Sequence, residues 1–211
     1  MDKLDFSKQY PDYYSAKTTP SLLEIGATHY LSISGKGDPS GPEFKAHIEA
    51  LYPVAYTLKF MGKAIQKDFI VPKLEGLWWF DENKFRHISG ADAPTNIPRA
   101  EWSYRLLIRL PEWVKQKDLE TAKQEAALKK PELDISTIDF FEMQEGLSLQ
   151  ILHKGAFDQE PESLLLMHHF MEEQHLERNG YHHEIYLSDF RKTAADKLKT
   201  ILRQPVKPMN K

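Results

Sequence analysis

Three residues near the carboxyl end of the chain are spaced so that a carboxylate could lie between an imidazole and a phenol. In the segment HHEIYLSD (182–189), His182, Glu184 and Tyr186 are two residues apart. In a strand they share one face, because successive side chains alternate between faces. A carboxylate removed from water has a raised pKa, which suits a general base or acid. Glu184 is therefore the first catalytic candidate, and the alternative is a glutamate that faces solvent and pairs across a sheet.

Aromatic side chains that could form the walls of a cleft are plentiful, with 4 Trp, 9 Tyr and 11 Phe among 211 residues. Trp78 and Trp79 face opposite sides of a strand, so one can pack in the core while the other stacks on a planar ligand. A tyrosine hydroxyl, Tyr104 or Tyr186, could donate a hydrogen bond to a developing oxyanion. The further ligand-binding candidates, each of which also has a purely structural interpretation, are Tyr56, His153, Phe157 and His182.

Histidines gather between residues 168 and 183, but their spacing does not favour a metal site. Glu172 and His175 form a single Glu-x-x-His pair, whereas a di-iron bundle needs that pair on two helices. Cysteine is absent, which excludes disulfides and cysteine-ligated zinc or iron–sulfur sites. The turn GKGDP (35–39) lacks the Gly-Lys-Ser/Thr ending of a phosphate-binding loop. We therefore expect no metal, no nucleotide and no cofactor.

Composition and charge predict a folded, water-soluble chain. Hydrophobic residues make up 41% and charged residues 28%, and 28 Lys+Arg against 31 Asp+Glu give a net charge of −3. This balance argues against direct nucleic-acid binding, which needs clustered cations. No apolar run approaches the ~20 residues that span a bilayer, and the first residues lack a signal-peptide core. We expect a cytoplasmic protein without membrane contact, and its oligomeric state stays open.

The elements that must position these residues follow from hydrophobic spacing and from turn residues. A helix should begin at Pro42 and be kinked or adjusted at Pro53, because proline lacks the amide hydrogen that a helix needs. A second amphipathic helix should begin at Pro161, and residues 199–211 look like a proline-broken polar tail. Residues 1–25 look like an irregular arm. The expected strands are 29–37, 68–80, 101–110, 145–155 and 182–189, with a largely solvated helix at about 112–130.

The two halves of the chain repeat one order of elements. A strand, Lys-Gly, a short turn, Pro-Glu and an amphipathic helix occur at 36–43 and again at 154–162. We therefore predict a single α+β domain over 1–211 that is built from a duplicated β-α-β-β module. Its halves lie at about 27–110 and 145–190, with an antiparallel sheet, two main helices and one inserted helix. The cleft along the pseudo-twofold axis is the expected binding site.

Six segments in order resemble GyrI-like small-molecule-binding proteins. The segments are GKGDPSGPEF (35–44), ALYPVAYTLKF (50–60), LEGLWWF (74–80), EGLSLQILHKG (145–155), HHEIYLSD (182–189) and KTILRQPVK (199–207). The resemblance implies the duplicated module inferred above. It also implies a pocket glutamate in a Glu-x-Tyr context, which falls on Glu184.

The resemblance is to the stand-alone branch of that family, because the chain carries no helix-turn-helix extension. One subgroup of this branch is associated with hydrolysis of the cyclopropane ring in DNA-alkylating natural products, which protects the cell. The hypothesis is a cofactor-independent hydrolase for planar, hydrophobic xenobiotics, in which Glu184 activates water. Two alternatives are a module that binds or senses amphipathic compounds without turnover, and an interaction protein that resembles gyrase inhibitors.

Overall fold

One antiparallel sheet organises the protein. The computed structural model describes residues 3–88 and 93–209. Within these residues the strands lie in the order β4-β1-β3-β2-β6-β7-β5, and β4 also pairs with β7, so the sheet closes on itself. The strands are β1 (Ser21–Lys36), β2 (Leu74–Trp79), β3 (Ser103–Arg109), β4 (Asp139–Lys154), β5 (Leu176–Arg178), β6 (His182–Tyr186) and β7 (Lys199–Pro208).

Two copies of a β-α-β-β module make up this fold, which confirms the predicted α+β class. The first is β1-α3-β2-β3 and the second is β4-α6-β6-β7, with β5 added after α6. Like strands meet across the pseudo-twofold axis, because β1 pairs with β4 and β2 pairs with β6. The helices are α1 (Phe6–Gln9), α2 (Pro11–Tyr14), α3 (Pro42–Ala64), α4 (Ala93–Asn96), α5 (Gln116–Lys129) and α6 (Glu160–Glu173), with short 3₁₀ turns η1 (Arg99–Glu101), η2 (Phe157–Gln159) and η3 (Ala195–Lys197).

Helix α3 covers much of the main hydrophobic core. Pro42 occupies its first turn, where a missing amide hydrogen costs nothing. Apolar residues three or four apart then face the sheet and are buried: Phe44, Ile48, Leu51, Val54, Ala55 and Leu58. The helix continues through Pro53 without a break, and the Thr57 hydroxyl donates to the Pro53 carbonyl at 2.9 Å.

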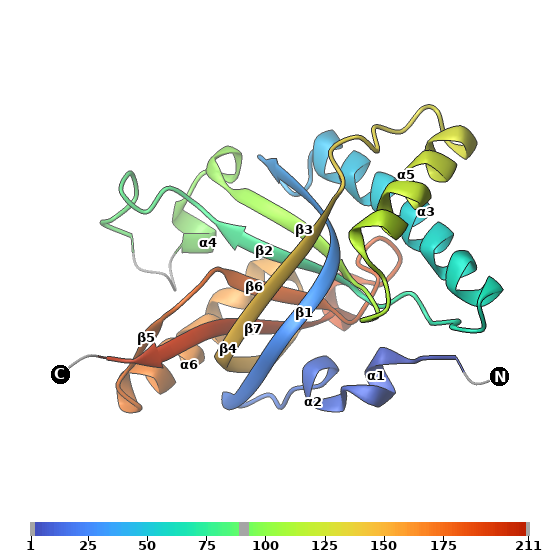
Figure 1. Ribbon diagram of the computed structural model, residues 1–211. Coiled ribbons are helices and arrows are strands. Elements are labelled where there is room, and N and C mark those ends of the chain that lie inside the picture. The colour runs from blue at the N-terminus through green and yellow to red at the C-terminus, as the bar shows by residue number, and fades with distance from the viewer. Residues whose placement is uncertain (1–2, 89–92, 210–211) are drawn as a thin grey trace.

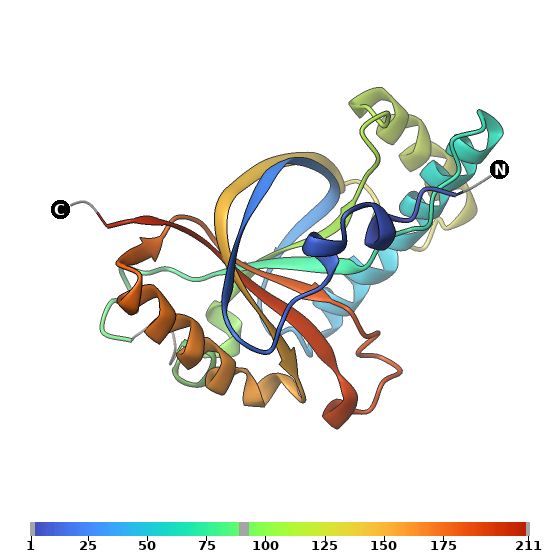
Figure 2. The ribbon, with the colours of Figure 1, turned by 90° about the horizontal axis from the view of Figure 1, so that it is seen from below.

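The three larger helices lie at two ends of the molecule. Figures 1 and 2 show α3 and α5 side by side at one end of the molecule and α6 at the other. Helix α5 packs on α3 through Leu119, Ala122 and Ala126, which are buried. No helix within the described residues is both long and apolar enough to cross a membrane.

The final segment differs from its sequence-based interpretation. Residues 199–208 form β7, a strand buried from Thr200 to Val206 that pairs with both β4 and β6. The prediction of a polar tail was wrong because Pro205 was taken as a strand breaker. Pro205 has no amide hydrogen to donate, but its carbonyl accepts from the Asn179 amide at 2.8 Å. The expected irregular arm likewise contains α1 and α2, and β1 already begins at Ser21.

Candidate functional site

Glu184 lies at the centre of the sheet, on the strand that joins the two modules. Its backbone pairs with Gly76 of β2, and its side chain is only 12% exposed. One Glu184 carboxylate oxygen is 3.7 Å from Nε2 of His182, which places the two side chains on one face of β6. The carboxylate is therefore nearly enclosed at the pseudo-twofold axis, where the sequence predicted a binding site.

Gly76 leaves room for the polar groups around Glu184. A Cβ atom at Gly76 would lie 3.0 Å from both the Trp78 indole nitrogen and the Tyr186 hydroxyl. These two atoms are hydrogen-bonded, with Trp78 Nε1 donating to Tyr186 Oη at 3.1 Å. We define Glu160, Glu184, Tyr186 and Trp78 as the carboxylate cluster.

Glu160, the member of the carboxylate cluster that sequence reasoning missed, comes from the first turn of α6. It is 6% exposed, and its Oε1 has no hydrogen-bond partner among the described residues. Burial, and then the negative charge of Glu184, raise the pKa of Glu160 well above its usual range. This shift favours the protonated, neutral form of Glu160. Its position before Pro161 was the only sequence signal, and that signal indicates a helix start rather than a buried acid.

Burial also perturbs the protonation of Glu184 and its neighbours. It raises the pKa of Glu184 to about 7, against the opposing effects of Tyr186, His183 and Trp78. Burial lowers the pKa of His182 to about 3, so its imidazole is neutral. It raises the pKa of Tyr186 far above that of a free phenol, and the Glu184 carboxylate adds to the rise. At neutral pH the face therefore presents one carboxyl group near its titration point and several neutral hydrogen-bonding groups.

A groove of about 880 Å³ opens beside this cluster. Tyr186 lines one end of it, while Tyr52, Tyr56 and Phe60 of α3 form a wall. Phe190 and Arg191 follow β6 and close another side, and Arg191 lies over the Tyr52 ring at 5.4 Å. Tyr186 thus belongs to both the groove and the carboxylate cluster. Tyr56 is 47% exposed, so a ligand could stack on it.

The remaining predicted site residues fall in different surroundings. Tyr104 is 1% exposed, and its hydroxyl lies 3.0 Å from Nδ1 of His47. Trp79 points to the opposite face from Trp78 and stacks on Tyr181 with ring centroids 4.6 Å apart. His153 is 4% exposed, with both ring nitrogens 3.0 Å from protein oxygens, in Ser163 and Ala156.

Phe157 approaches the cluster from the second module. It is 37% exposed and meets the Tyr186 ring edge-on at a centroid distance of 6.1 Å. The structure therefore brings Glu184, Tyr186, Trp78, His182 and Phe157 together. Tyr56 joins them through the groove, whereas Trp79 and His153 lie elsewhere.

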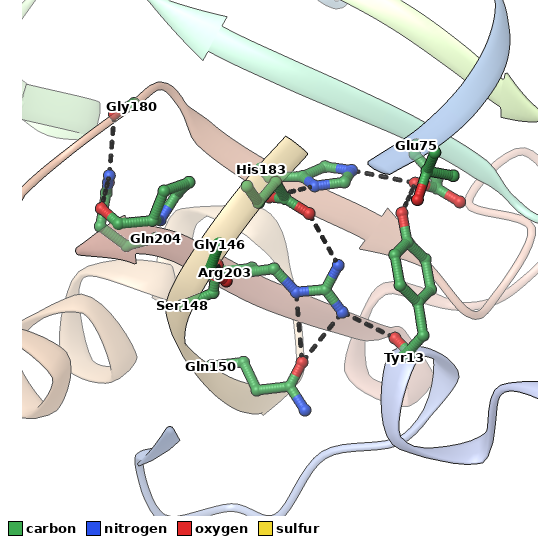
Figure 3. Close-up of polar contacts among 12 residues, drawn as sticks. Tyr13, Glu75, Gly146, Ser148, Gln150, Gly180, His183, Arg203 and Gln204 are labelled. Carbon is green, nitrogen blue, oxygen red and sulfur yellow. Dashed lines mark hydrogen bonds and ion pairs between the residues drawn. The ribbon is translucent and has the colours of Figure 1, made fainter. Parts of the chain in front are cut away.

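The opposite face of the same strands carries a buried ion network that the sequence did not reveal (Figure 3). His183 Nε2 lies 3.0 Å from Glu75 and its Nδ1 2.9 Å from Glu145. Arg203 donates to Glu145 at 3.2 Å and to the Tyr13 carbonyl at 2.7 Å. Burial disfavours the charged imidazole, but the two carboxylates outweigh it and raise the pKa of His183 to about 9. We call Glu75, Glu145, His183 and Arg203 the interior network.

No group of three or more His, Asp or Glu side chains within residues 3–88 and 93–209 is arranged to hold a metal ion. The histidines that lie close together in the sequence belong to different parts of the fold. His168 lies on α6 beside Glu172 at 3.3 Å, whereas His183 belongs to the interior network.

Comparison with known proteins agrees with this architecture. A family model for the GyrI-like small molecule binding domain matches residues 18–207. An uncharacterized conserved protein from Listeria innocua is 36% identical, with a TM-score of 0.87 over 97% of this chain and 100% of that one. A hydrolase from Listeria innocua is also 36% identical, with a TM-score of 0.85 over 98% of this chain and 100% of that one.

More distant matches show the fold alone. The C-terminal domain of EcmrR is 12% identical, with a TM-score of 0.53 over 90% of this chain and 98% of that one. A comparison with curated proteins finds no match.

Proposed function

The chain belongs to the GyrI-like small molecule binding domain family, and from that premise we propose that it is a cofactor-independent hydrolase for planar, electrophilic xenobiotics that carry a strained cyclopropane ring. The observation that carries this proposal is the pair of buried carboxyl groups, Glu160 and Glu184, in one cluster with Tyr186, which also lines the aromatic groove. The raised pKa of Glu160 favours its protonated form, and burial raises the pKa of Glu184 to about 7. Ligand binding alone requires neither property, whereas general acid–base catalysis requires both.

The groove positions the substrate. The flat body lies against Tyr52 and Tyr56, and the reactive end reaches Tyr186. The 36% identity to a protein described as a hydrolase supports chemistry at such a site rather than binding alone.

The carboxylate cluster performs the reaction. Glu184, as carboxylate, removes a proton from water while the water oxygen bonds to a ring carbon. The ring carbon–carbon bond breaks, and its electron pair moves through the conjugated system to a carbonyl oxygen. Tyr186 donates a hydrogen bond to that oxygen, and Glu160 supplies the proton that completes the product. A proton then passes from Glu184 to Glu160, which restores the starting state without any cofactor.

We assign the oxyanion role to Tyr186 rather than Tyr104. The Tyr104 hydroxyl is engaged by His47, and burial raises its pKa to about 12. Tyr186 instead lines the groove, and its hydroxyl accepts from Trp78 and donates to the Glu184 carboxylate. When Glu184 takes a proton from water, this donor is released and can turn to the developing oxyanion.

The test is incubation with a cyclopropane-containing alkylator, followed by mass spectrometry. A gain of one water is expected, with kcat/KM rising as pH passes about 7 because Glu184 must be ionised. Glu184→Gln and Glu160→Gln should each lower kcat by roughly 10²–10⁴-fold. Glu160→Gln should keep the rise near pH 7, because glutamine imitates a neutral acid. Glu162→Gln, at an exposed position two residues away, is the matched control.

Binding without any mass change would instead assign the chain to the sequestering or sensing class. The groove alone favours that second function, because its aromatic wall needs no carboxyl pair to hold a ligand. Full turnover by Glu184→Gln would remove Glu184 from the mechanism.

A further inference from the structure

A second pocket lies on the other side of the sheet from the carboxylate cluster. It has a volume of about 180 Å³. The arm before α1, α1 itself, β1 and the end of β3 supply its walls, and it shares no lining residue with the groove. We call it the arm pocket.

Arg109 is the charged group of the arm pocket that carries the inference. The residue is 8% exposed, and aromatic rings cover its guanidinium. The centroids of Tyr10, Tyr13 and Phe6 lie 4.0, 4.7 and 5.4 Å from its central carbon. These contacts hold the planar group in one orientation and exclude water from its faces.

The N–H groups along the edge of the same guanidinium have no acceptor among the described residues. Within residues 3–88 and 93–209, no carboxylate or carbonyl accepts a hydrogen bond from Arg109, and no acid lies within ion-pair distance of it. Its nitrogens are also not among the fully buried atoms that lack a partner, and the residue lines the arm pocket. An arginine with fixed faces and a free edge is organised for the two parallel hydrogen bonds that a carboxylate accepts.

The balance of buried charge points the same way. Arg109 and Arg203 both lie against the Tyr13 ring, at 4.7 and 4.2 Å from its centroid. Within the interior network, protonated His183 and Arg203 already have Glu75 and Glu145 as partners, whereas Arg109 has no carboxylate within ion-pair distance among the described residues. One negative charge beside Arg109 would therefore neutralise the group.

The remaining walls decide what kind of anion fits. They combine apolar side chains with polar ones: Leu4, Phe6, Leu110, Pro111 and Trp113 are apolar, and Gln9, Thr28, His29 and Glu112 are polar. Glu112 is an exposed acid and repels a dianion more strongly than a monoanion, whereas a monocarboxylate can place its short apolar body against the apolar side chains. We propose that the arm pocket binds a small monocarboxylate with an apolar body, held by Arg109.

Benzoate is the probe, and isothermal titration of the full chain at pH 7 is the measurement. One benzoate per chain is expected, and the neutral analogue benzamide should not bind. Arg109→Met, which keeps an apolar stem under the rings, should weaken binding at least tenfold. Arg105→Met on the same strand, whose partner is Asp139 outside the arm pocket, should leave it unchanged.

A second variant keeps the test decisive if Arg109→Met does not fold. Ala27→Phe adds bulk to the wall of the arm pocket while leaving Arg109 in place, and should also abolish binding. Equal benzoate affinity in the wild type and in either pocket variant would overturn the proposal. Displacement of benzoate by a planar dye in the groove would also overturn it, as would tighter binding of inorganic phosphate. None of these outcomes depends on whether the chain hydrolyses a cyclopropane.

Discussion

At the scale of single residues, Glu160 differs from a surface glutamate because the fold buries its carboxyl group and leaves one oxygen without a hydrogen-bond partner among the described residues. A buried carboxyl group with an unpartnered oxygen destabilises a fold, and natural proteins keep such groups mainly where they serve function. The cost depends on pH in a way that can be measured without any substrate. Glu160 can therefore be tested independently of the proposed reaction.

We predict that Glu160→Gln stabilises the protein increasingly as pH rises from 5 to 7. Unfolded Glu160 ionises above about pH 4.3, whereas the raised pKa of the folded residue favours its protonated form. The folded state thus binds more protons, and its free energy of unfolding falls as pH rises. The free energy of unfolding of Glu160→Gln should therefore exceed that of the wild type by a margin that grows by up to ~1.4 kcal/mol per pH unit. Urea denaturation at each pH measures it.

The control for that series is Glu162→Gln, whose effect should not vary with pH because the side chain is exposed. A flat difference for Glu160→Gln would show that Glu160 is ionised in the folded protein, and the acid role proposed for it would then fail.

At the scale of elements, α3 supplies the wall of the groove while it also covers the core. Its buried and exposed positions are interleaved, so aromatic residues on its outer edge can change without opening the core. Tyr56 is 47% exposed and lines the groove, whereas Leu51, Val54 and Leu58 nearby are fully buried.

We predict that Tyr56→Ala weakens binding of a planar aromatic dye about 5- to 30-fold, the scale of ~1–2 kcal/mol expected for a lost stacking ring. The melting temperature should stay near that of wild type. Fluorescence titration of the dye measures the affinity. Ile65→Ala is the control, because Ile65 is also exposed, at 59% against 47% for Tyr56, but lies outside the groove. Equal losses in both variants would show that the dye binds α3 without using the groove.

The elements were largely predictable from sequence because their signals are local. Pro42 at a helix start and alternation in 182–189 needed no tertiary information. Strand β7 was missed because the partner of its proline carbonyl, Asn179, is distant in the sequence and comes close only in the fold. Glu184 was singled out as a candidate by its strand alternation and by the family resemblance. Glu160 was not, because only three-dimensional packing buries an acid at a helix start.

At the scale of the whole molecule, the two faces of the central strands carry different groups of residues, the carboxylate cluster on one face and the interior network on the other. Residues at even positions of β6 face the carboxylate cluster, and His183 between them joins the interior network. This network links β2, β4, β6 and β7. The N-terminal arm joins it through Tyr13 of α2, whose hydroxyl donates to Glu75 at 2.5 Å. The positive charge of His183 also holds down the pKa of Glu184, so the interior influences the titration of the carboxylate cluster.

We therefore predict that Arg203→Met lowers the free energy of unfolding by about 3–5 kcal/mol, because it leaves Glu145 buried without its arginine partner. Burial alone would raise the pKa of Glu145, yet His183 and Arg203 lower it to about 2 in the intact network. Lys207→Met is the control on the same strand, since Lys207 pairs with Glu177 at an exposed site and should contribute no more than ~1 kcal/mol. Chemical denaturation of both variants at pH 7 measures the difference. If the two losses were equal, the interior network would not be what holds the closed sheet together, and the burial of Arg203 would need another explanation.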